Sequence, residues 1–265
     1  MEKPKLTAEA AAETIAKLTG IEKIDIALTL GSGWAKAADL AGEELASLDA
    51  SDIPGFHKTS VSGHTGKLRI MQLASGKKAL VVGARTHLYE GHGVDSVAHG
   101  VLVSAAMGAE IMVLTNGAGG IKENWIAGQP VLISDHINLT ATSPLRGANF
   151  VDLTDLYSSR IRKLALEVDS SLDSGVYVQF PGPHYETPAE VLMAKAMGGD
   201  IVGMSTAIEA IAARASGMEV FGMSLITNLA AGIQKTPLSH QEVIDAGKLA
   251  EPKIAKLLAE IVNKL

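Results

Sequence analysis

The chain has 265 residues, of which 47% are hydrophobic and 20% charged. This balance is ordinary for a folded globular protein and excludes disorder over most of the chain. The formal net charge of −6 argues against non-specific nucleic-acid binding, because such binding needs basic patches that displace counterions from phosphates. The absence of cysteine rules out disulfide bonds, zinc–thiolate and iron–sulfur sites, and cysteine nucleophiles. The first residues lack the apolar stretch of a signal peptide, and no run approaches about 18 apolar residues, so we expect a cytoplasmic protein without a membrane span.

The first half of the chain alternates predicted helices with predicted strands. Helices are expected at 7–20, 34–46 and 94–107, and strands at 24–30, 67–73, 79–82 and 111–115. Thr7 is a candidate N-cap for the first helix, and the second and third strands are expected to form a hairpin. The segment 116–120, Asn-Gly-Ala-Gly-Gly, is expected to be a glycine-rich turn after its strand.

The second half continues the alternation. Strands are expected at 131–139, 175–180, 201–204 and 220–227, and helices at 154–168, 187–197, 206–216 and 239–265. Three of these helices begin with a capping-box pattern, in which Thr187, Thr206 and Ser239 are each followed three residues later by glutamate. The whole chain, 1–265, is therefore predicted to be a single α/β domain with a central mixed β-sheet surrounded by helices.

Ligands of open α/β sheets bind beyond the carboxyl ends of the strands, and several predicted strands end in small or polar residues. Gly31-Ser-Gly33 is either a cradle for a phosphate or a tight strand–helix turn. No Gly-Lys-Ser/Thr follows it, and Lys36 stands where a dinucleotide fingerprint would have its third glycine, so neither a Walker loop nor a Rossmann oxidoreductase is favoured.

Arg85 and His87 lie two residues apart just after a strand, which points both side chains the same way in extended backbone. Arginine suits bidentate binding of phosphate, but a surface arginine beside a structural histidine is equally compatible with the sequence. His87, His92 and His99 do not have the spacing of a helical zinc pair, so no metal site is expected.

Carboxylates and amides at other strand ends offer hydrogen bonds to a ligand. Glu190 and Glu209 are explained by their capping boxes, whereas Glu186 has no such local role and could bind the N–H edge of a polar ring. Asn228 could offer a donor and an acceptor to a heterocycle, or could cap a turn. Ser205 is left available because Thr206 is the better N-cap.

Eight segments, in this order, resemble the trimeric class of purine nucleoside phosphorylases. They are Leu30-Gly-Ser-Gly33, Gly63-His-Thr-Gly66, Arg85-Thr-His-Leu-Tyr-Glu-Gly-His92, Thr115-Asn-Gly-Ala-Gly-Gly120, Pro144-Leu-Arg-Gly147, Gly182-Pro-His-Tyr-Glu-Thr187, Gly203-Met-Ser-Thr206 and Ser224-Leu-Ile-Thr-Asn228. No single segment is decisive, but the ordered set is specific, and it spans roughly residues 25 to 250.

The resemblance implies a glycosyltransferase of purine salvage, which cleaves purine (deoxy)ribonucleosides with inorganic phosphate to the free base and (deoxy)ribose 1-phosphate. It implies no cofactor, since phosphate is a co-substrate, and a homotrimer as the assembly. Its transition state resembles an oxocarbenium ion, which needs an anion near the ribose and hydrogen bonds to the departing base.

The resemblance also assigns site residues. Phosphate would be held by Ser32, His64, Arg85, His87, the backbone near Gly117, and Ser205. The ribose would contact Tyr89, Met204 and, at its 5′-hydroxyl, His240. The purine would contact Tyr185, Glu186 and Asn228, with Glu186, Asn228 and His87 as the catalytic residues. Phe150 is the candidate aromatic that caps the pocket of a neighbouring subunit.

The expected substrate follows from Asn228, because the related methylthioadenosine phosphorylases carry aspartate there, which suits a 6-amino purine. Asparagine and His240 together favour 6-oxopurine nucleosides such as inosine and guanosine, with a free 5′-hydroxyl. The family often has phenylalanine where this chain has Tyr185, and tyrosine keeps an aromatic face for stacking. Alanine is common where this chain has Gly117, and glycine keeps the expected contact because the backbone makes it. A purine sensor without catalysis and a nucleoside hydrolase are the alternatives; Arg85 and His87 argue against the first, and the lack of an aspartate cluster against the second.

Overall fold

The structure, a computed structural model, describes residues 2–58 and 65–265. The helices are α1 (Glu2–Thr19), α2 (Lys36–Ala41), α3 (Val94–Ala106), α4 (Ser159–Val168), α5 (Pro188–Ala196), α6 (Ala207–Ala215) and α7 (His240–Val262). The strands are β1 (Ile26–Thr29), β2 (Gly42–Asp49), β3 (Lys67–Leu73), β4 (Lys78–Val82), β5 (Ile111–Gly120), β6 (Gln129–Asn138), β7 (Asp173–Gln179), β8 (Ile201–Gly203) and β9 (Glu219–Leu229).

Within these described residues the strands form one mixed sheet in the order β2-β3-β4-β1-β5-β8-β7-β6-β9. β1 pairs in parallel with β4 and β5, whereas β3 is antiparallel to both β2 and β4. Because β5 also pairs with β9, the strands β5, β8, β7, β6 and β9 close on themselves. The predicted α/β fold with a central mixed sheet is therefore confirmed, and β5 is the strand shared by its open and closed parts.

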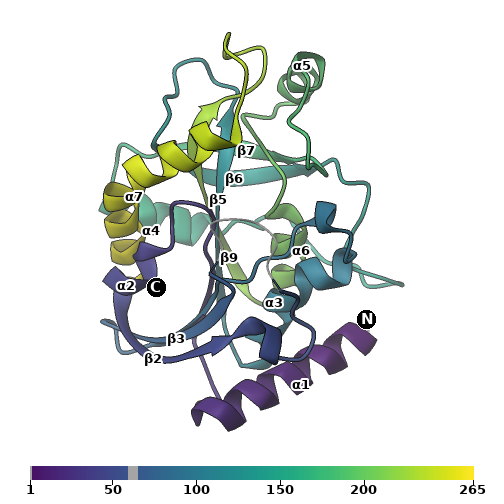
Figure 1. The fold of residues 1–265 in the computed structure, drawn as a ribbon, viewed down its shortest axis with the longest axis vertical. Coiled ribbons are helices and arrows are strands. Elements are labelled where there is room, and N and C mark those ends of the chain that lie inside the picture. The colour runs from purple at the N-terminus through teal and green to yellow at the C-terminus, as the bar shows by residue number, and fades with distance from the viewer. Residues whose placement is uncertain (1, 59–64) are drawn as a thin grey trace.

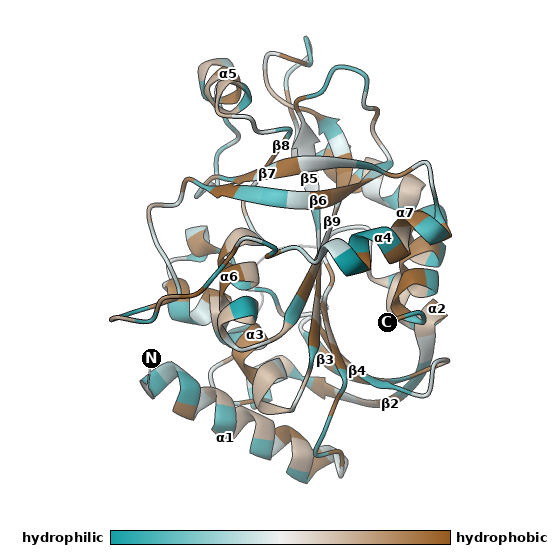
Figure 2. Cartoon of the chain, turned by 180° about the vertical axis from the view of Figure 1, so that it is seen from behind, coloured by the Kyte–Doolittle hydropathy of each residue, from teal (hydrophilic) through white to brown (hydrophobic). Residues whose placement is uncertain are grey.

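Helices cover both faces of the sheet (Figure 1). One hydrophobic core contains Ile15 of α1, Val101 of α3 and Ala210 of α6, and a second contains Ile161 of α4 and Ile254 of α7. Figure 2 shows hydrophobic residues concentrated along the strands between these two helical layers. Burial on both faces holds the central strands in place and leaves their ends to carry polar groups.

The predicted helix at 34–46 is wrong in its second half. Only α2 is helical, and the chain then turns into β2, which runs antiparallel to β3 with Gly42 opposite Leu73. A Cβ atom at Gly42 would lie 2.0 Å from the carbonyl oxygen of Gln72, so only glycine allows this close pairing. Pairing with a neighbouring strand outweighs the helix preference of the Glu-Glu-Leu-Ala stretch that follows.

The glycine-rich segment 116–120 is not a turn but the second half of β5, which pairs with β9 over its whole length. A Cβ at Gly119 would lie 3.0 Å from Val202 Cγ2, and one at Gly120 would lie 3.1 Å from Ile226 Cγ2. The glycines are thus needed because neighbouring strands pack closely on this part of β5.

Helix starts depart from prediction at two places. α1 begins before Thr7, whose hydroxyl donates to the Lys3 carbonyl inside the helix (3.0 Å). α4 begins only after Ser158, whose side chain accepts from Ile161 N, because the Ser158 amide is bonded to the Val220 carbonyl beside β9. The predicted hairpin of β3 and β4 and the capping box at Thr187 are confirmed.

In the part of the chain that the structure describes, no helix combines the length and apolar character that crossing a membrane would require.

Trp34 ties the segment before α2 to β5, since its indole N–H donates to the carbonyl of the buried residue Asn116 (3.0 Å). Trp125 is equally buried, but its N–H donates to Asp173, whose side chain is 40% exposed. We expect Trp34→Phe to lower the free energy of unfolding by about 1–3 kcal/mol more than Trp125→Phe, because water replaces the lost donor only at Asp173. Urea denaturation of both variants measures the difference, and equal losses would contradict it.

Candidate active site

One pocket lies where several strands end, and it is lined by groups from distant parts of the chain. Its lining residues are Gly31, Ser32, Arg85, His87, Tyr89, Asn116, Gly117, Ala118, Gly119, Tyr185, Glu186, Val202, Gly203, Met204, Ser205, Thr227, Asn228, Ala230, Leu238 and Val243. They follow or end β1, β4, β5, β7, β8 and β9, or flank the start of α7. The ends of these strands therefore converge on one crevice, at the place where α/β sheets bind their ligands.

The pocket brings together ten of the site residues expected from the sequence. They are Ser32, Arg85, His87, Tyr89, Gly117, Tyr185, Glu186, Met204, Ser205 and Asn228. His64 lies outside the described residues, and the side-chain position of His240, the first residue of α7, lies outside the description as well. Phe150 does not line this pocket; it belongs to a connection between β6 and α4 and is 94% exposed.

Arg85 is the buried cation of the pocket, with only 5% of its surface exposed. Its Nη1 donates to the Thr115 carbonyl (2.7 Å), and its Nε donates to Glu209 Oε1 (3.1 Å). The third nitrogen, Nη2, is buried and has no hydrogen-bond partner among the described residues. A guanidinium held on two sides with its remaining nitrogen unmatched is suited to an anion.

Glu209 makes two contacts, of which the sequence predicted only the capping box. Its Oε2 accepts from the Thr206 amide (3.0 Å), as expected of a capping box. Its Oε1 also accepts from Arg85, in an ion pair whose two side chains are 2% and 3% exposed. The interpretation of Glu209 as a cap alone is incomplete, because only the tertiary structure brings Arg85 within reach of it.

His87 lies beside Arg85 and is fixed by its own segment. Its amide donates to Glu90 Oε1 (2.6 Å), and its ring stacks on Tyr89 at 4.8 Å between centroids. Burial lowers the pKa of His87 from its ordinary value, and the neighbouring Arg85 cation lowers it further. Both effects disfavour the imidazolium, while the carboxylates of Glu209 and Glu90 favour it.

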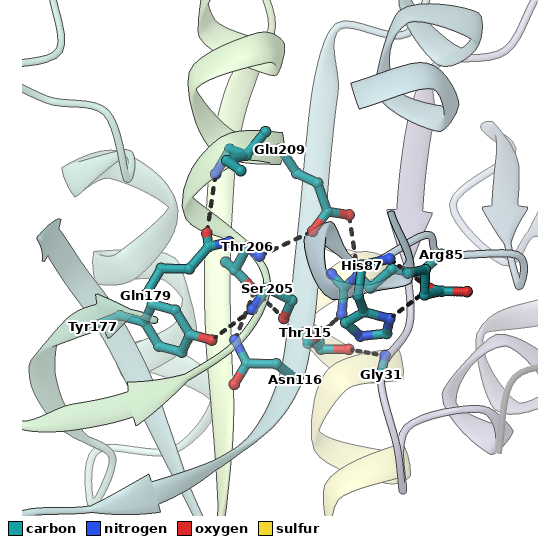
Figure 3. A network of polar contacts seen from close by, with 12 residues as sticks. Gly31, Arg85, His87, Thr115, Asn116, Tyr177, Gln179, Ser205, Thr206 and Glu209 are labelled. Carbon is teal, nitrogen blue, oxygen red and sulfur yellow. Dashed lines mark hydrogen bonds and ion pairs between the residues drawn. The ribbon is translucent and has the colours of Figure 1, made fainter. Parts of the chain in front are cut away.

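Ser205 reaches the pocket from the turn between β8 and α6. Its amide donates to the Tyr177 hydroxyl (3.2 Å), and the Ile208 amide donates to Gln179 Oε1 (3.2 Å). Figure 3 shows these side chains gathered around the start of α6, with Glu209 reaching across to Arg85. Because these amides are bonded within the protein, the group that Ser205 can offer a ligand is its hydroxyl.

Glu186 and Asn228 occupy the other side of the lining. Glu186 is 6% exposed, and its buried Oε1 has no hydrogen-bond partner among the described residues. Burial raises the pKa of Glu186. Asn228 accepts from the Thr227 hydroxyl (2.8 Å) and donates to the Leu229 carbonyl (2.9 Å), which orients its amide and leaves one N–H and one lone pair for a ligand.

Gly31, by contrast, is not free to serve as a cradle through its amide. The Gly31 N–H donates to the Thr115 hydroxyl (3.0 Å), and a Cβ there would lie 2.7 Å from Asn116 Cα. The Gly31-Ser-Gly33 segment is thus packed tightly onto β5, with Ser32 among the residues that line the pocket.

Comparisons with known proteins identify the family. The family model described as "Phosphorylase superfamily" matches residues 25–263. A purine nucleoside phosphorylase of a Cellulomonas species is 59% identical over 265 residues, covering 98% of this chain and 94% of its own. The corresponding protein of Mycobacterium tuberculosis is 51% identical over 261 residues, covering 98% and 97%. This chain belongs to the purine nucleoside phosphorylase family.

Solved structures of the family have the same fold. The crystal structure of Schistosoma mansoni purine nucleoside phosphorylase in complex with inosine has a TM-score of 0.88 and 35% identity, and the match covers 98% of this chain and 96% of that one. A schistosoma purine nucleoside phosphorylase in complex with hypoxanthine has the same TM-score at 34% identity, covering 97% and 96%.

Several lining residues were not singled out from the sequence. Asn116 donates to the Thr206 hydroxyl (2.9 Å), and its Oδ1 is buried without a partner among the described residues. The signal in the sequence was its predicted position directly after a strand, although the structure places it within β5. Val202, Thr227, Leu238 and Val243 also line the pocket. Nothing in their local sequence distinguishes them from ordinary core residues.

Among the residues that the structure describes, no group of three or more His, Cys, Asp or Glu side chains is arranged so that it could hold a metal ion.

The surroundings of His87 predict its titration. In phosphate-free buffer, we expect its pKa to lie below 6.5, and Arg85→Gln to raise it, because one of the two effects that disfavour the imidazolium is then removed. Below pH 6.5 the unfolded chain binds a proton that folded His87 does not, so this group makes the fold less stable as the pH falls. NMR titration of the ring protons measures the pKa, and a value above 6.5, or one unaffected by Arg85→Gln, would contradict the prediction.

Proposed function

We propose that this chain catalyses the reversible phosphorolysis of 6-oxopurine (deoxy)ribonucleosides to the free base and (deoxy)ribose 1-phosphate, as a pentosyltransferase of purine salvage. One observation carries this proposal: the same pocket is lined by Arg85 and by Glu186, whose buried Nη2 and Oε1 have no hydrogen-bond partner among the described residues. The first is complementary to an anion, and the second to an N–H donor. A purine nucleoside and phosphate together present that pair of groups.

Phosphate would be bound by Arg85, His87, Ser205 and Ser32, with the Gly117 backbone and His64 adding contacts. His87 Nδ1 lies 3.2 Å from Glu90 Oε1, so the other ring nitrogen donates to phosphate when the ring is protonated, and the Ser205 and Ser32 hydroxyls supply further donors. The bound anion lies beneath the ribose in this arrangement, where it stabilises the positive charge that develops on the sugar.

The nucleoside would occupy the rest of the pocket. Tyr89 and Met204 contact the ribose, His240 the 5′-hydroxyl, and Tyr185 stacks on the base. Glu186 accepts from the N1–H of the purine. The remaining N–H of Asn228 donates to N7 and O6 as N7 gains electron density. The hydrogen bond that Asn228 donates to N7 strengthens as the glycosidic bond breaks, so it stabilises the transition state more than the bound substrate.

The preference for 6-oxopurines follows from the donor pattern. N1 of inosine or guanosine carries a hydrogen and can donate a hydrogen bond to an ionised Glu186. N1 of adenosine has no hydrogen and can only accept a hydrogen bond. Structures of Schistosoma relatives in complexes with hypoxanthine, inosine and guanosine support purine substrates, although isoform 2 is described with cytosine and ribose-1-phosphate. One is also described with adenosine, so binding and turnover have to be measured separately.

The proposed assembly is a homotrimer in which Phe150 of one subunit caps the pocket of the next. The exposure of 94% of this side chain, which is costly for a phenylalanine in water, supports a covered position in the assembly. We propose no cofactor, because phosphate is the co-substrate, and a cytoplasmic location. Light scattering tests the assembly, with three times 27.5 kDa as the expected mass.

A coupled assay for hypoxanthine with inosine as the substrate tests the reaction. Hypoxanthine release that requires inorganic phosphate supports the proposal. Release without phosphate would replace it with hydrolysis, and binding of nucleoside without release would replace it with a sensor. Guanosine, adenosine and methylthioadenosine assayed beside inosine define the purine preference.

Asn228→Asp tests the role of the amide. Aspartate offers acceptors to an exocyclic amino group, so we expect the ratio of kcat/KM for adenosine to that for inosine to rise at least about tenfold. Asn228→Leu is the matched control, because it keeps a similar volume without polar atoms and should lower turnover of both substrates. An unchanged ratio in Asn228→Asp would remove Asn228 from base selection.

A further inference from the structure

Glu209 connects two parts of the phosphate side that are far apart in sequence. It lies in the first turn of α6, is 2% exposed, and makes one contact with each of its carboxylate oxygens. Oε1 accepts from Arg85 Nε, in the segment that follows β4, and Oε2 accepts from the amide of Thr206, next to Ser205. Figure 3 shows the side chain bridging these two elements.

The Thr206 end of this bridge holds an unfavourable backbone conformation. Thr206 has φ +83°, a region that a β-branched residue rarely adopts. The bond from its amide to Glu209, together with the Asn116 amide that donates to its hydroxyl, keeps the turn in place. Ser205 and Thr206 hydroxyls lie 3.1 Å apart, so the position of the turn also sets the position of the Ser205 hydroxyl.

We propose that Glu209 is a positioning residue for phosphate, which acts by holding Arg85 and the Ser205–Thr206 turn at a fixed separation. This inference rests on the proposed function, since it assigns phosphate to that side of the pocket. Glu209 itself contacts no substrate; its two oxygens are used within the protein.

The bridge requires a carboxylate and not merely a polar side chain. Both partners are N–H donors, and each takes a separate oxygen. A glutamine has one acceptor oxygen, and its NH₂ group would face a donor whichever way the amide is turned. One of the two contacts is then lost in a site from which water is excluded, and the released element shifts.

Glu209→Gln is the first test. We expect KM for phosphate, and the Kd for phosphate measured by calorimetry, to rise at least about tenfold, because one buried donor loses its partner. KM for inosine should change by less than about threefold, since Glu186 and Asn228 belong to other elements. A purely structural role predicts instead a loss of stability with both KM values unchanged or raised together, which would overturn the inference.

Glu190→Gln is the matched control. Glu190 occupies the same position in the capping box of α5, where its Oε2 accepts from the exposed Thr187. Glutamine is an ordinary residue at this position of a capping box, and water can bond any unmatched group there. The Kd for phosphate should be unchanged in this variant, and a rise equal to that in Glu209→Gln would assign the effect to capping rather than to the bridge.

A double variant tests whether Glu209 acts through Arg85. In an Arg85→Gln background, adding Glu209→Gln should raise the Kd for phosphate by much less than it does alone, and a full additive effect would overturn the inference. If Glu209→Gln does not fold, Glu209→Asp replaces it, because the shorter carboxylate reaches only one of the two donors and should show the same selective rise.

Failure of the proposed function gives a different result from failure of this inference. If the unsubstituted chain shows neither phosphate binding by calorimetry nor phosphate-dependent turnover, the proposed function is wrong. If the unsubstituted chain does both and Glu209→Gln retains its affinity for phosphate, only the role of Glu209 is wrong.

Discussion

A buried ion pair between Arg85 and Glu209 organises the polar side of the pocket. Both side chains are almost fully buried, and charges are costly to remove from water unless their hydrogen-bonding groups are matched. Two nitrogens of Arg85 are matched by Glu209 and by the Thr115 carbonyl, and the buried Nη2 has no partner among the described residues. The structure thus holds a cation in a fixed orientation before any anion arrives, and such preorganisation lowers the cost of binding and of charge stabilisation.

β5 is the structural element that makes this arrangement possible. It pairs with β1 in the open part of the sheet, with β9 in the closed part, and through Gly119 and Gly120 with β8. Its glycines allow close contact with the side chains of β8 and β9, and its Thr115 bonds both Gly31 and Arg85. One strand therefore sets the positions of three of the segments that line the pocket.

The two sides of the pocket are electrostatically distinct, and the chemistry depends on that difference. Arg85 presents a cation suited to phosphate, whereas Glu186 presents an acceptor and Asn228 presents one N–H and one lone pair to the base. In the proposed phosphorolysis the sugar becomes positive while the base becomes negative, so phosphate bound on the first side stabilises the sugar and the N–H of Asn228 on the second side stabilises the base. The pKa values of His87 and Glu186 are shifted mainly by burial, and burial also strengthens the electrostatic contacts that these side chains make.

The amino-acid sequence alone determined the α/β class, most helices and strands, and the order of the motifs that resemble the family, because hydrophobic periodicity, capping boxes and strand-end glycines are local signals. Tertiary structure decided what those signals do not encode. The segment after Gly42 became a strand because β3 lies beside it, and 116–120 became strand because β8 and β9 pack against it. The second role of Glu209 has the same origin, since its partner Arg85 lies 124 residues away along the chain and only folding brings the two together.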